Sequence, residues 1–378
     1  FQEKRDGTGG ATQLALAEHK GDGTVLILAG DTPLLTNQTL SEFIQVHDDR
    51  KNIASVLTAL QPDPTGYGRV IRSSDDQILK IVEEKDATES EKEIDEINTG
   101  VYLFDLALLR DVIKNLKNDN AQKELYLTDV ISLINTSGKK SHAILSNDYS
   151  ETLGINDRTQ LAECAAIMRD RINSQHMLNG VTIVDPTTTW IDHDVKIESD
   201  VLIYPGSSIT GASNIKSEAV IGPRTTLNSC VVEEGAKVVE SNCTESVIGK
   251  GAKVGPFTYL RKGSVLKNES KAGSFVEIKN STVGKGSKVA HLSYVGDAEI
   301  GDETNIGAAT VFVNYDGENK HKTKVGDHVR IGSDTMLVAP VTVGDGAYTA
   351  AGSVINEDVP AGAIGIGRAR QVNILGWV

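Results

Sequence analysis

Two features near the start of the sequence have residue types that can hold phosphates or a metal ion. The run G-T-V-L-I-L-A at 23–29 predicts a buried parallel strand, and Asp31 follows its carboxyl end. A carboxylate in that place can hold Mg²⁺ against substrate phosphates, although a turn aspartate with only a structural hydrogen bond explains it equally well. The G-T-G turn at 7–9 offers backbone N–H groups to a phosphate or a base edge, but so short a motif is weak by itself.

The elements that must position these groups alternate along the first half of the chain. Apolar segments at 54–59 and 101–104 alternate with helical stretches such as 40–48 and 106–116, which predicts an α/β (Rossmann-like) sandwich. A helix over 157–175 is typical of a connecting arm. The sequence starts at Phe1 without an initiator Met and enters the G-T-G turn within ten residues, so we expect the α/β domain to be incomplete at its N-terminus.

A six-residue repeat organises the second half. Aliphatic residues recur at every sixth position, first at Ile191, Ile197, Ile203, Ile209, Ile215 and Ile221, and later at Ile248, Val254, Leu260 and Leu266. A helix would space its apolar residues by three and four, so this period predicts short strands that each bury one aliphatic side chain before a turn. Such coils must stack to bury their apolar side. The series breaks at 268–282 and at 313–324, and we expect both segments to loop outward.

The composition limits the classes of function. With 38 Lys+Arg against 52 Asp+Glu the formal net charge is -14, which argues against a general affinity for nucleic acid or an anionic membrane. No stretch approaches the roughly 20 apolar residues of a membrane-spanning helix, so no membrane insertion is expected. The cysteines Cys164, Cys230 and Cys243 show no C-x-x-C spacing and are typical of a reducing compartment, which predicts a cytoplasmic protein.

Ordered motifs along the whole chain resemble one bacterial enzyme family. The repeat is similar to that of hexapeptide acyltransferases, which are left-handed parallel β-helices that form homotrimers with active sites in clefts between subunits. The chain resembles the bifunctional N-acetylglucosamine-1-phosphate uridyltransferase / glucosamine-1-phosphate acetyltransferase family in these segments: GDTPL (30–34), DPTGYGRV (63–70), EINTGVY (96–102), GINDR (154–158), SFVEIKN (274–280), AHLSYVGDAEIGDETNIGA (290–308) and NYDGENKHKT (314–323). The resemblance implies a nucleotidyltransferase-like uridyltransferase (pyrophosphorylase) domain at 1–156, a helical arm and linker at 157–186, and a β-helix acetyltransferase domain with a C-terminal tail at 187–378.

The resemblance assigns acetyl transfer to His291. In the family this position is the general base that takes a proton from the 2-amino group of glucosamine 1-phosphate, so that the amine can attack the thioester of acetyl-CoA; an imidazole suits this task because it titrates near neutral pH. Arg261 and Lys279 match positions that hold the sugar phosphate, and Tyr294 and Asn305 match sugar contacts. The positions that match the acetyl-CoA cleft are Ala308, Asn314, Tyr315, Ser333, Ala351 and Arg368. We interpret Lys320, in the second break, either as a partner of a CoA phosphate or as a solvated loop lysine.

For the first domain the resemblance implies Mg²⁺-dependent uridylyl transfer from UTP to N-acetylglucosamine 1-phosphate, which gives UDP-N-acetylglucosamine for peptidoglycan and lipopolysaccharide precursors. Asp31 and Asn156 match the metal pair of the family. The other positions that match contacts to the nucleotide sugar are Gln2, Gly7, Thr8, Ala29, Gly30, Gly68, Glu83 and Asn98. Such an in-line transfer depends mainly on positioning and on neutralisation of charge.

Departures from the family pattern leave alternatives open. The family opens with a strand and a glycine-rich loop with a following lysine, which cradle the triphosphate, and this sequence has neither; if the protein starts at Phe1, we expect severely impaired uridylyl transfer. Asp6 stands where the family usually has Leu, and we expect this departure to affect the nucleotide pocket. We expect Lys262, Asn280 and Ala309 to change affinity in the acetyl site without abolishing its chemistry. Two other interpretations remain: an acetyltransferase whose first domain is only a scaffold, and a catalytically silent regulatory subunit.

Overall fold

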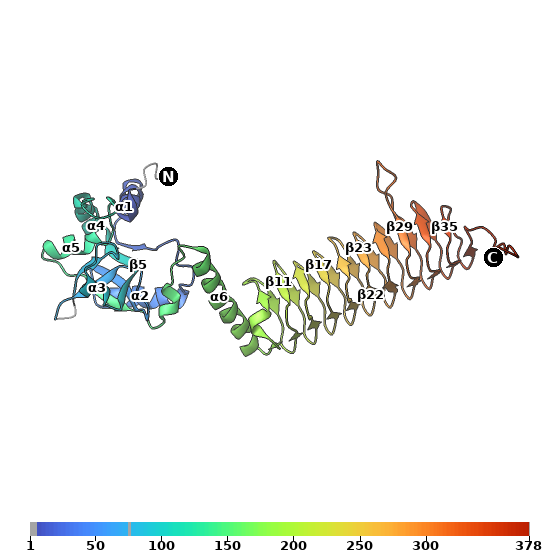
Figure 1. The fold of residues 1–378 in the computed structure, drawn as a ribbon, viewed down its shortest axis with the longest axis horizontal. Coiled ribbons are helices and arrows are strands. Elements are labelled where there is room, and N and C mark those ends of the chain that lie inside the picture. The colour runs from blue at the N-terminus through green and yellow to red at the C-terminus, as the bar shows by residue number, and fades with distance from the viewer. Residues whose placement is uncertain (1–5, 75–76, 378) are drawn as a thin grey trace. The chain divides into compact units, whose positions relative to one another are not determined.

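The computed structural model describes residues 6–74 and 77–377, and the chain divides into two compact units between Ile167 and Met168. The first is an α/β unit, and the second is a long stack of short strands (Figure 1). Among the residues that are described, no helix combines the length and the apolar character that a membrane crossing requires.

A six-stranded mixed sheet forms the centre of the first unit. Its strands run in the order β4-β3-β5-β2-β6, with β1 beside β5. The strands are β1 (Thr24–Ile27), β2 (Ala54–Leu60), β3 (Arg69–Arg72), β4 (Ile78–Val82), β5 (Glu96–Asp105) and β6 (His142–Leu145). The helices are α1 (Gly7–Glu18), α2 (Asn37–Asp49), α3 (Glu89–Lys92), α4 (Leu106–Val112) and α5 (Asp129–Thr136), with the 3-10 turns η1 (Ile113–Asn115) and η2 (Tyr149–Thr152). Helix α6 (Arg158–Leu178) spans the boundary between the two units.

Strand β5 shows why helices cover both faces of this sheet. Its residues V-Y-L-F at 101–104 are all buried, and successive side chains of a strand point to opposite faces. Val101 and Leu103 pack with Phe43 of α2 on one face. Tyr102 and Phe104 belong to the apolar cluster of the other face, together with residues of α4 and α5. A continuous apolar run therefore gives a sheet between two layers of helices.

The structure corrects two predictions for the first unit. The run at 23–29 is not a buried parallel strand: β1 pairs antiparallel with β5, and its residues are exposed or half-buried. Within the described residues β5 is its only strand partner, and Val25, Leu26 and Ile27 are only partly covered by the apolar clusters on the two faces of the sheet. The G-T-G segment is not a free turn, because it begins helix α1, and the N–H of Gly9 donates to the carbonyl of Leu125 at 2.8 Å.

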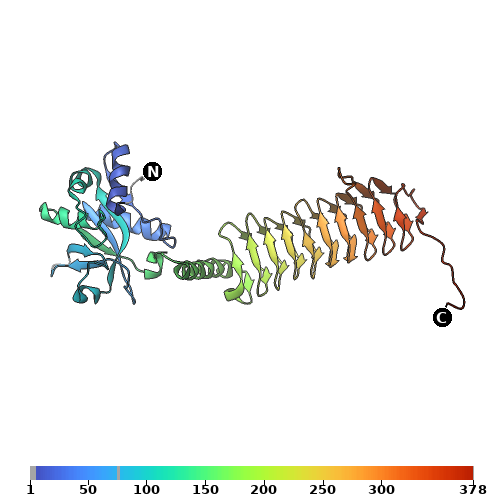
Figure 2. The same cartoon turned by 45° about the horizontal axis from the view of Figure 1, so that its top comes forward.

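Three parallel sheets form the second unit, and each coil of the stack gives one strand to each sheet (Figure 2). The strands are two to four residues long. The β7 sheet runs from β7 (Thr182–Ile183) to β36 (Ile364–Gly365), the β8 sheet from β8 (Trp190–Ile191) to β35 (Val354–Ile355), and the β9 sheet from β9 (Lys196–Ile197) to β33 (Val341–Val343). The 3-10 turn η3 (Pro186–Thr188) precedes β8, and residues 366–377 leave the last coil without regular secondary structure.

The six-residue series lies inside this stack. Ile203, Ile209 and Ile215 are completely buried and stand in β10 (Leu202–Ile203), β11 (Ser208–Thr210) and β12 (Asn214–Ile215), one strand of each sheet. They belong to one apolar cluster that continues through the coils. Burial of one such side chain stabilises the fold by about 1.5–3 kcal/mol relative to exposure. The repeat therefore holds the coils together, and the predicted parallel β-solenoid is confirmed.

The prediction that residues 268–282 loop outward is wrong. Lys271 pairs with Lys253 and Thr282 pairs with Val265, as in a regular coil. The inward position here is taken by Ala272, which is completely buried. A small residue at an inward position interrupts the aliphatic pattern without interrupting the coil.

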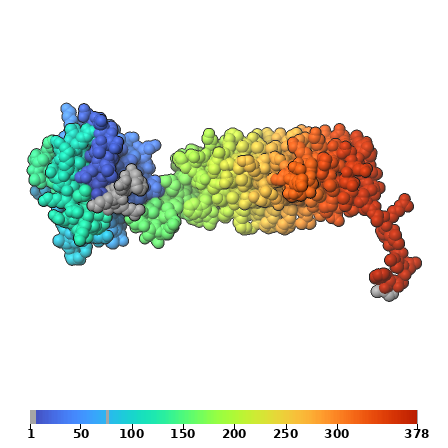
Figure 3. Space-filling view, turned by 90° about the horizontal axis from the view of Figure 1, so that it is seen from above, coloured from blue at the N-terminus to red at the C-terminus, as the bar shows by residue number. Residues whose placement is uncertain are grey.

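Most of the predicted 313–324 segment does leave the stack: residues 314–322 project from it, whereas Val313 still ends β29 (Val311–Val313) and Thr323 begins β30 (Thr323–Val325). Val289 pairs with Ile306 after 17 positions, but Ile306 pairs with Ile331 only after 25. The additional residues form a projecting loop, which we call the 313–324 loop, closed by an antiparallel bridge between Tyr315 and Lys320. It rises above the coils in Figure 1 and is the orange cluster that faces the viewer in Figure 3.

Candidate active sites

His291 lies where the chain turns from one sheet of the solenoid into the next. It ends β25 (Lys288–His291) of the β7 sheet, and β26 (Tyr294–Gly296) of the β8 sheet follows. Its carbonyl accepts hydrogen bonds from the N–H of Ala309 (3.2 Å) and the hydroxyl of Ser293 (2.8 Å). Its side chain is exposed, and within the described part of the chain no group hydrogen-bonds to the imidazole. A fixed backbone and an unengaged ring suit a base that acts on a bound ligand.

Residues of both sheets surround this corner. Asn305 begins β28 (Asn305–Ile306) and is the register partner of Lys288, on the strand of His291. Tyr294 stands on β26, and Gly296 is packed so closely that a Cβ there would lie 2.5 Å from the Tyr294 hydroxyl and 2.6 Å from the amide nitrogen of Asn314. Only glycine leaves room for these two polar groups to approach each other.

Three cations gather beside these groups. Lys279 ends β23 (Glu277–Lys279), and its amine contacts that of Lys320 in the 313–324 loop; this contact first, then burial and the charge of Lys320, lower the pKa of Lys279. Arg261 adds a third positive charge close to Lys279, and its guanidinium pairs with Glu277 at 2.9 Å. Like charges at this range repel, so the arrangement is stabilised when an anion binds between them. A phosphate dianion has the charge and the acceptor oxygens for this place.

A buried carboxylate holds the 313–324 loop against the cations. Asp297 is only 8% exposed and accepts hydrogen bonds from the amides of Asn280 and Asn314, both at 2.6 Å. Burial alone would raise its pKa, but the two amide donors and the charges of Lys279 and Lys320 outweigh burial and lower the pKa of Asp297 below its usual value. Asp297 is therefore a charged anchor for the loop at neutral pH.

Sequence reasoning missed Asp297 and did not place Lys320 with Lys279. Asn280 and Asn314 each lie 17 residues from Asp297, one coil before it and one coil after it. That coil length is the signal that predicts such neighbours. Asn280, which departs from the lysine of the family pattern, acts as a neutral hydrogen-bond donor to this carboxylate.

Four positions that match the acetyl-CoA cleft follow one edge of the stack. The carbonyl of Ala308 accepts from the N–H of residue 334 at 2.8 Å, and the carbonyl of Ser333 accepts from the N–H of Gly352 at 2.9 Å. Ala351 precedes Gly352, whose Cβ position would lie 3.7 Å from Cδ of Arg368. These residues therefore lie on successive turns of the stack.

The other two predicted cleft residues make different contacts. Asn314 is buried, and its amide faces Asp297. Tyr315 is exposed, and its hydroxyl donates to the carbonyl of Gly317 within the 313–324 loop. Ala309, at the corner beside His291, has a φ of 60°, a left-handed conformation in which a Cβ is strained.

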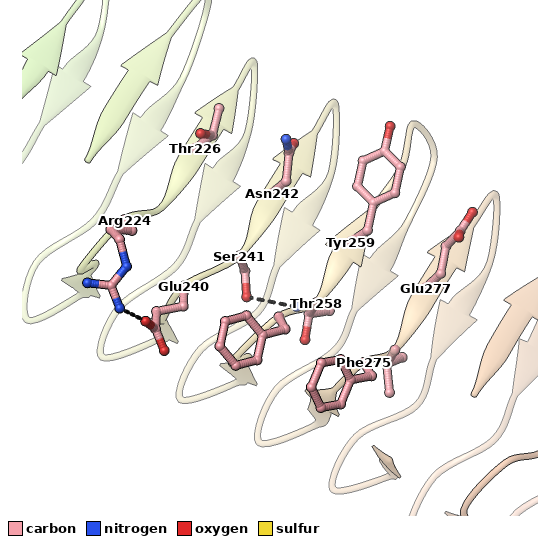
Figure 4. Close-up of a pocket in the computed structure, with 11 residues that line it drawn as sticks. Arg224, Thr226, Glu240, Ser241, Asn242, Thr258, Tyr259, Phe275 and Glu277 are labelled. Carbon is pink, nitrogen blue, oxygen red and sulfur yellow. Dashed lines mark hydrogen bonds and ion pairs between the residues drawn. The ribbon is translucent and has the colours of Figure 1, made fainter. Parts of the chain in front are cut away.

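An open groove of about 530 Å³ lies on the coils that precede this cluster (Figure 4). Arg224 and Glu240 form an ion pair at one side of it. Phe257 and Phe275 stack with their ring centroids 5.3 Å apart. Glu277, the ion-pair partner of Arg261, also lines the groove, so the groove adjoins the cation cluster.

In the first unit a cavity of about 510 Å³ collects part of the predicted nucleotide-sugar site. The predicted residues in its lining are Thr8, Ala29, Gly30, Glu83 and Asn98. Gly68 adjoins them, because its carbonyl accepts from the N–H of Asn98 at 2.8 Å. Burial raises the pKa of Glu83, although the hydroxyl of Thr128 donates to its carboxylate at 3.0 Å. No Lys or Arg stands among the described residues that line this cavity.

The backbone brings the predicted metal pair together. The N–H of Ile155 donates to the carbonyl of Asp31 at 2.9 Å, and the next residue, Asn156, is held by the side chain of Gln160 in α6 at 2.7 Å. Within the described ranges no three His, Cys, Asp or Glu side chains form a metal-binding group. One carboxylate and one amide oxygen nevertheless fit Mg²⁺, which takes few protein ligands and completes its shell with phosphates and water. Gln2 lies outside the described residues.

Comparisons with known proteins match both units. A family model for nucleotidyl transferases covers residues 1–192, and one for bacterial transferase hexapeptides (six repeats) covers residues 322–357. The chain is 51% identical over 379 residues to "Bifunctional protein GlmU" of Corynebacterium glutamicum (strain R), with 100% of this chain and 78% of the relative aligned. It is 52% identical over 379 residues to the protein of that name from Mycolicibacterium smegmatis, with 100% of this chain and 79% of the relative aligned. The chain therefore belongs to the bifunctional GlmU family.

Proposed function

We propose that the solenoid transfers the acetyl group of acetyl-CoA to the amine of glucosamine 1-phosphate. The observation that carries this proposal is the gathering of Arg261, Lys279 and Lys320 at the β8 sheet, where Lys279 is the register partner of Gly296, five residues after His291. A sugar phosphate bound through its phosphate neutralises these cations. Its amine is then available to an imidazole that no described protein group engages.

In the proposed reaction His291 acts as the general base. Its imidazole takes a proton from the ammonium group of the sugar, because a protonated amine has no lone pair for attack. The amine nitrogen then forms a bond to the thioester carbonyl carbon, and the carbon–sulfur bond breaks. The second proton of the attacking nitrogen passes to the departing CoA thiolate, and the proton held by His291 is released to solvent, so the products are the acetamide, free CoA and one proton. Tyr294 and Asn305, on either side of the corner, orient the sugar ring.

For the first unit we propose uridylyl transfer from UTP to N-acetylglucosamine 1-phosphate. Glu83 and Asn98 hold the nucleotide sugar in the cavity, and Asp31 and Asn156 would hold Mg²⁺, which supplies charge neutralisation for the phosphates. The pair of activities yields UDP-N-acetylglucosamine for cell-envelope precursors. We also propose that the protein is cytoplasmic and acts as a homotrimer. Three free cysteines support a reducing compartment, and a solenoid edge with predicted CoA positions is suited to a shared cleft.

The alternative of an acetyltransferase with an inactive first unit is not favoured, because the relatives that share about half of their residues with this chain over its whole length are bifunctional proteins. The alternative of a silent regulatory subunit is disfavoured, because Arg261, Lys279 and Asp297 form a connected polar cluster on the coils that bear the candidate base.

Acetyl transfer is tested directly by thiol release from acetyl-CoA in the presence of glucosamine 1-phosphate. His291→Ala is expected to lower kcat by about 10²–10⁴ while the protein stays folded. His193→Ala is the matched control, since His193 is exposed in a turn of the solenoid far along the sequence from the site. Near-normal turnover by His291→Ala would show that the base is assigned wrongly, and absence of turnover by the unmodified protein would sink the proposed function.

A further inference from the structure

The β7 sheet carries four lysines on consecutive coils. Lys237, Lys253, Lys271 and Lys288 are register partners in β16 (Lys237–Val238), β19 (Lys253–Val254), β22 (Lys271–Ser274) and β25. In each strand the lysine is exposed or half-buried, whereas the next residue is buried. All four side chains therefore point outward from one face. We call this row the lysine ladder.

The lysine ladder does not stabilise the fold by ion pairing. Neighbouring strands of a sheet lie about 4.8 Å apart, and like charges placed directly opposite each other repel. Elsewhere on the solenoid exposed lysines do have acidic partners, as Lys216 has Glu198 and Lys250 has Glu234. No acidic side chain among the described residues lies within ion-pair distance of a ladder lysine. The four charges are thus free to act on a ligand.

The ladder also stands in a region whose charge is opposite to that of the whole chain. Residues 233–288 contain ten Lys and Arg against six Asp and Glu, while the complete chain has a net charge of -14. An anionic substrate is repelled by the protein as a whole but attracted by this segment. A strip of local positive charge is therefore the favourable route of approach.

One end of the ladder reaches the candidate acetyl site. Lys288 shares β25 with His291 and is the register partner of Asn305 on the next coil. Counting coils of about 4.8 Å, Lys271 is about 10 Å from the level of Asn305, Lys253 about 14 Å and Lys237 about 19 Å. The row is thus a graded positive field that ends at the site.

We propose that the lysine ladder guides the phosphate-bearing acceptor sugar along the β7 sheet to the acetyl site. This inference rests on the proposed acetyl transfer and adds a role for residues outside the binding cluster. A charge 10–20 Å from a dianion acts mainly on the encounter and on KM, since it interacts almost equally with the ground state and the transition state. The turnover number is unaffected.

The test compares two triple variants with the same change in net charge. One is Lys237→Gln, Lys253→Gln and Lys271→Gln on the ladder. The matched control replaces Lys117, Lys139 and Lys140, three exposed lysines of the first unit, by Gln. Acetylation of glucosamine 1-phosphate is measured as kcat/KM from low salt to about 0.5 M salt, and thermal unfolding and oligomer mass are measured in parallel.

At low salt the ladder variant is expected to lose about tenfold in kcat/KM with kcat unchanged, whereas the control follows the unmodified protein. The difference should shrink above about 0.1 M salt, where the Debye length falls below 10 Å. Thermal stability should be unchanged or slightly higher, because a row of like charges has been removed.

Two results would overturn the inference while leaving the proposed function intact. One is that the ladder variant and the control variant are both active and that their kcat/KM values depend on salt in the same way. The other is a change of oligomer mass confined to the ladder variant, which would show that the row is an interface between copies. Failure of the unmodified protein to acetylate the sugar would instead remove the proposed function itself.

Discussion

Replacement of Lys320 by glutamine separates two roles for the 313–324 loop. In the sequence this lysine is either a partner of a CoA phosphate or a solvated loop residue, but in the structure its amine contacts that of Lys279. If the two amines hold the sugar phosphate together, Lys320→Gln raises KM for glucosamine 1-phosphate and leaves KM for acetyl-CoA unchanged. The turnover number stays near normal, because the phosphate is remote from the reacting amine and is bound alike in the ground state and the transition state.

The expected magnitude follows from the exposure of the two lysines. A hydrogen bond to a charged group contributes about 1.5–3 kcal/mol, and Lys320 is exposed while Lys279 is half-buried. Solvent screening therefore favours the lower end of that range. At about 1.4 kcal/mol per factor of ten, KM rises about tenfold. The relief of repulsion between the two amines in the free protein offsets part of this loss, so a much larger effect is not expected.

The same variant shifts the pH dependence of kcat/KM to higher pH on its alkaline side. Contact with Lys320, burial and the charge of Lys320 lower the pKa of Lys279. The cationic form of Lys279 is present below this pKa and is lost as pH rises through it. Without Lys320 the pKa of Lys279 moves back up, so the alkaline limb of kcat/KM, which reports on the free enzyme, shifts to higher pH.

Lys322→Gln is the matched control for this experiment. Lys322 stands in the same loop, carries the same charge and is 68% exposed, but it lies 3.6 Å from Glu299 and not beside Lys279. Steady-state acetylation at varied sugar phosphate and varied acetyl-CoA measures both KM values. Equal effects of the two substitutions on the sugar KM, or an effect of Lys320→Gln confined to the acetyl-CoA KM, would refute the reasoning.

Two further substitutions test the backbone and the anchor of the site. Ala309→Gly removes a Cβ from a residue with a φ of 60°, and the strain that is relieved amounts to about 1 kcal/mol. Calorimetry should show that the solenoid unfolds at a temperature about 2–4 °C higher. An unchanged or lower unfolding temperature would contradict the strain. Asn314→Ala leaves Asp297 buried with one amide donor fewer, so kcat/KM for the sugar phosphate should fall about 5- to 160-fold, which is the equivalent of about 1–3 kcal/mol for a buried group left unpaired. Asn319→Ala, at an exposed position of the same loop, should behave like the unmodified protein, and equal losses in both variants would point to general disturbance of the loop.

The solenoid is predictable from the sequence because one inward side chain per strand fixes its geometry. Ile203, Ile209 and Ile215 repeat at six residues and fill the inside of three successive sheets. The limit of this reasoning is seen at Ala272, where a small inward residue looks like a break although the coil is regular. Periodicity of side-chain size and periodicity of the backbone are different quantities, and only the first is visible in the sequence.

The first unit is harder to predict because its strand pairing is set by the sheet as a whole. The apolar run before Asp31 correctly predicts a strand, but nothing within it states that β5 lies antiparallel beside it. In the same way, Gly7 to Gly9 have the composition of a loop, yet the carbonyl of Leu125, more than a hundred residues later, takes up the N–H of Gly9 and the segment enters α1. Such contacts between distant segments are absent from local patterns.

The location of the acetyl site follows from the geometry of the solenoid sheets. Outward residues of one sheet form parallel rows about 4.8 Å apart, as the lysine ladder does, and a flat row cannot enclose a ligand. Enclosure needs groups from two sheets, which the turn after His291 supplies, and a third element above them. The longer coil between Ile306 and Ile331 supplies that element at small cost, since loop closure depends weakly on length. Asp297 then ties the 313–324 loop to the coils through Asn280 and Asn314, so that Lys320, although exposed, is brought to Lys279 by a loop that is anchored to the coils.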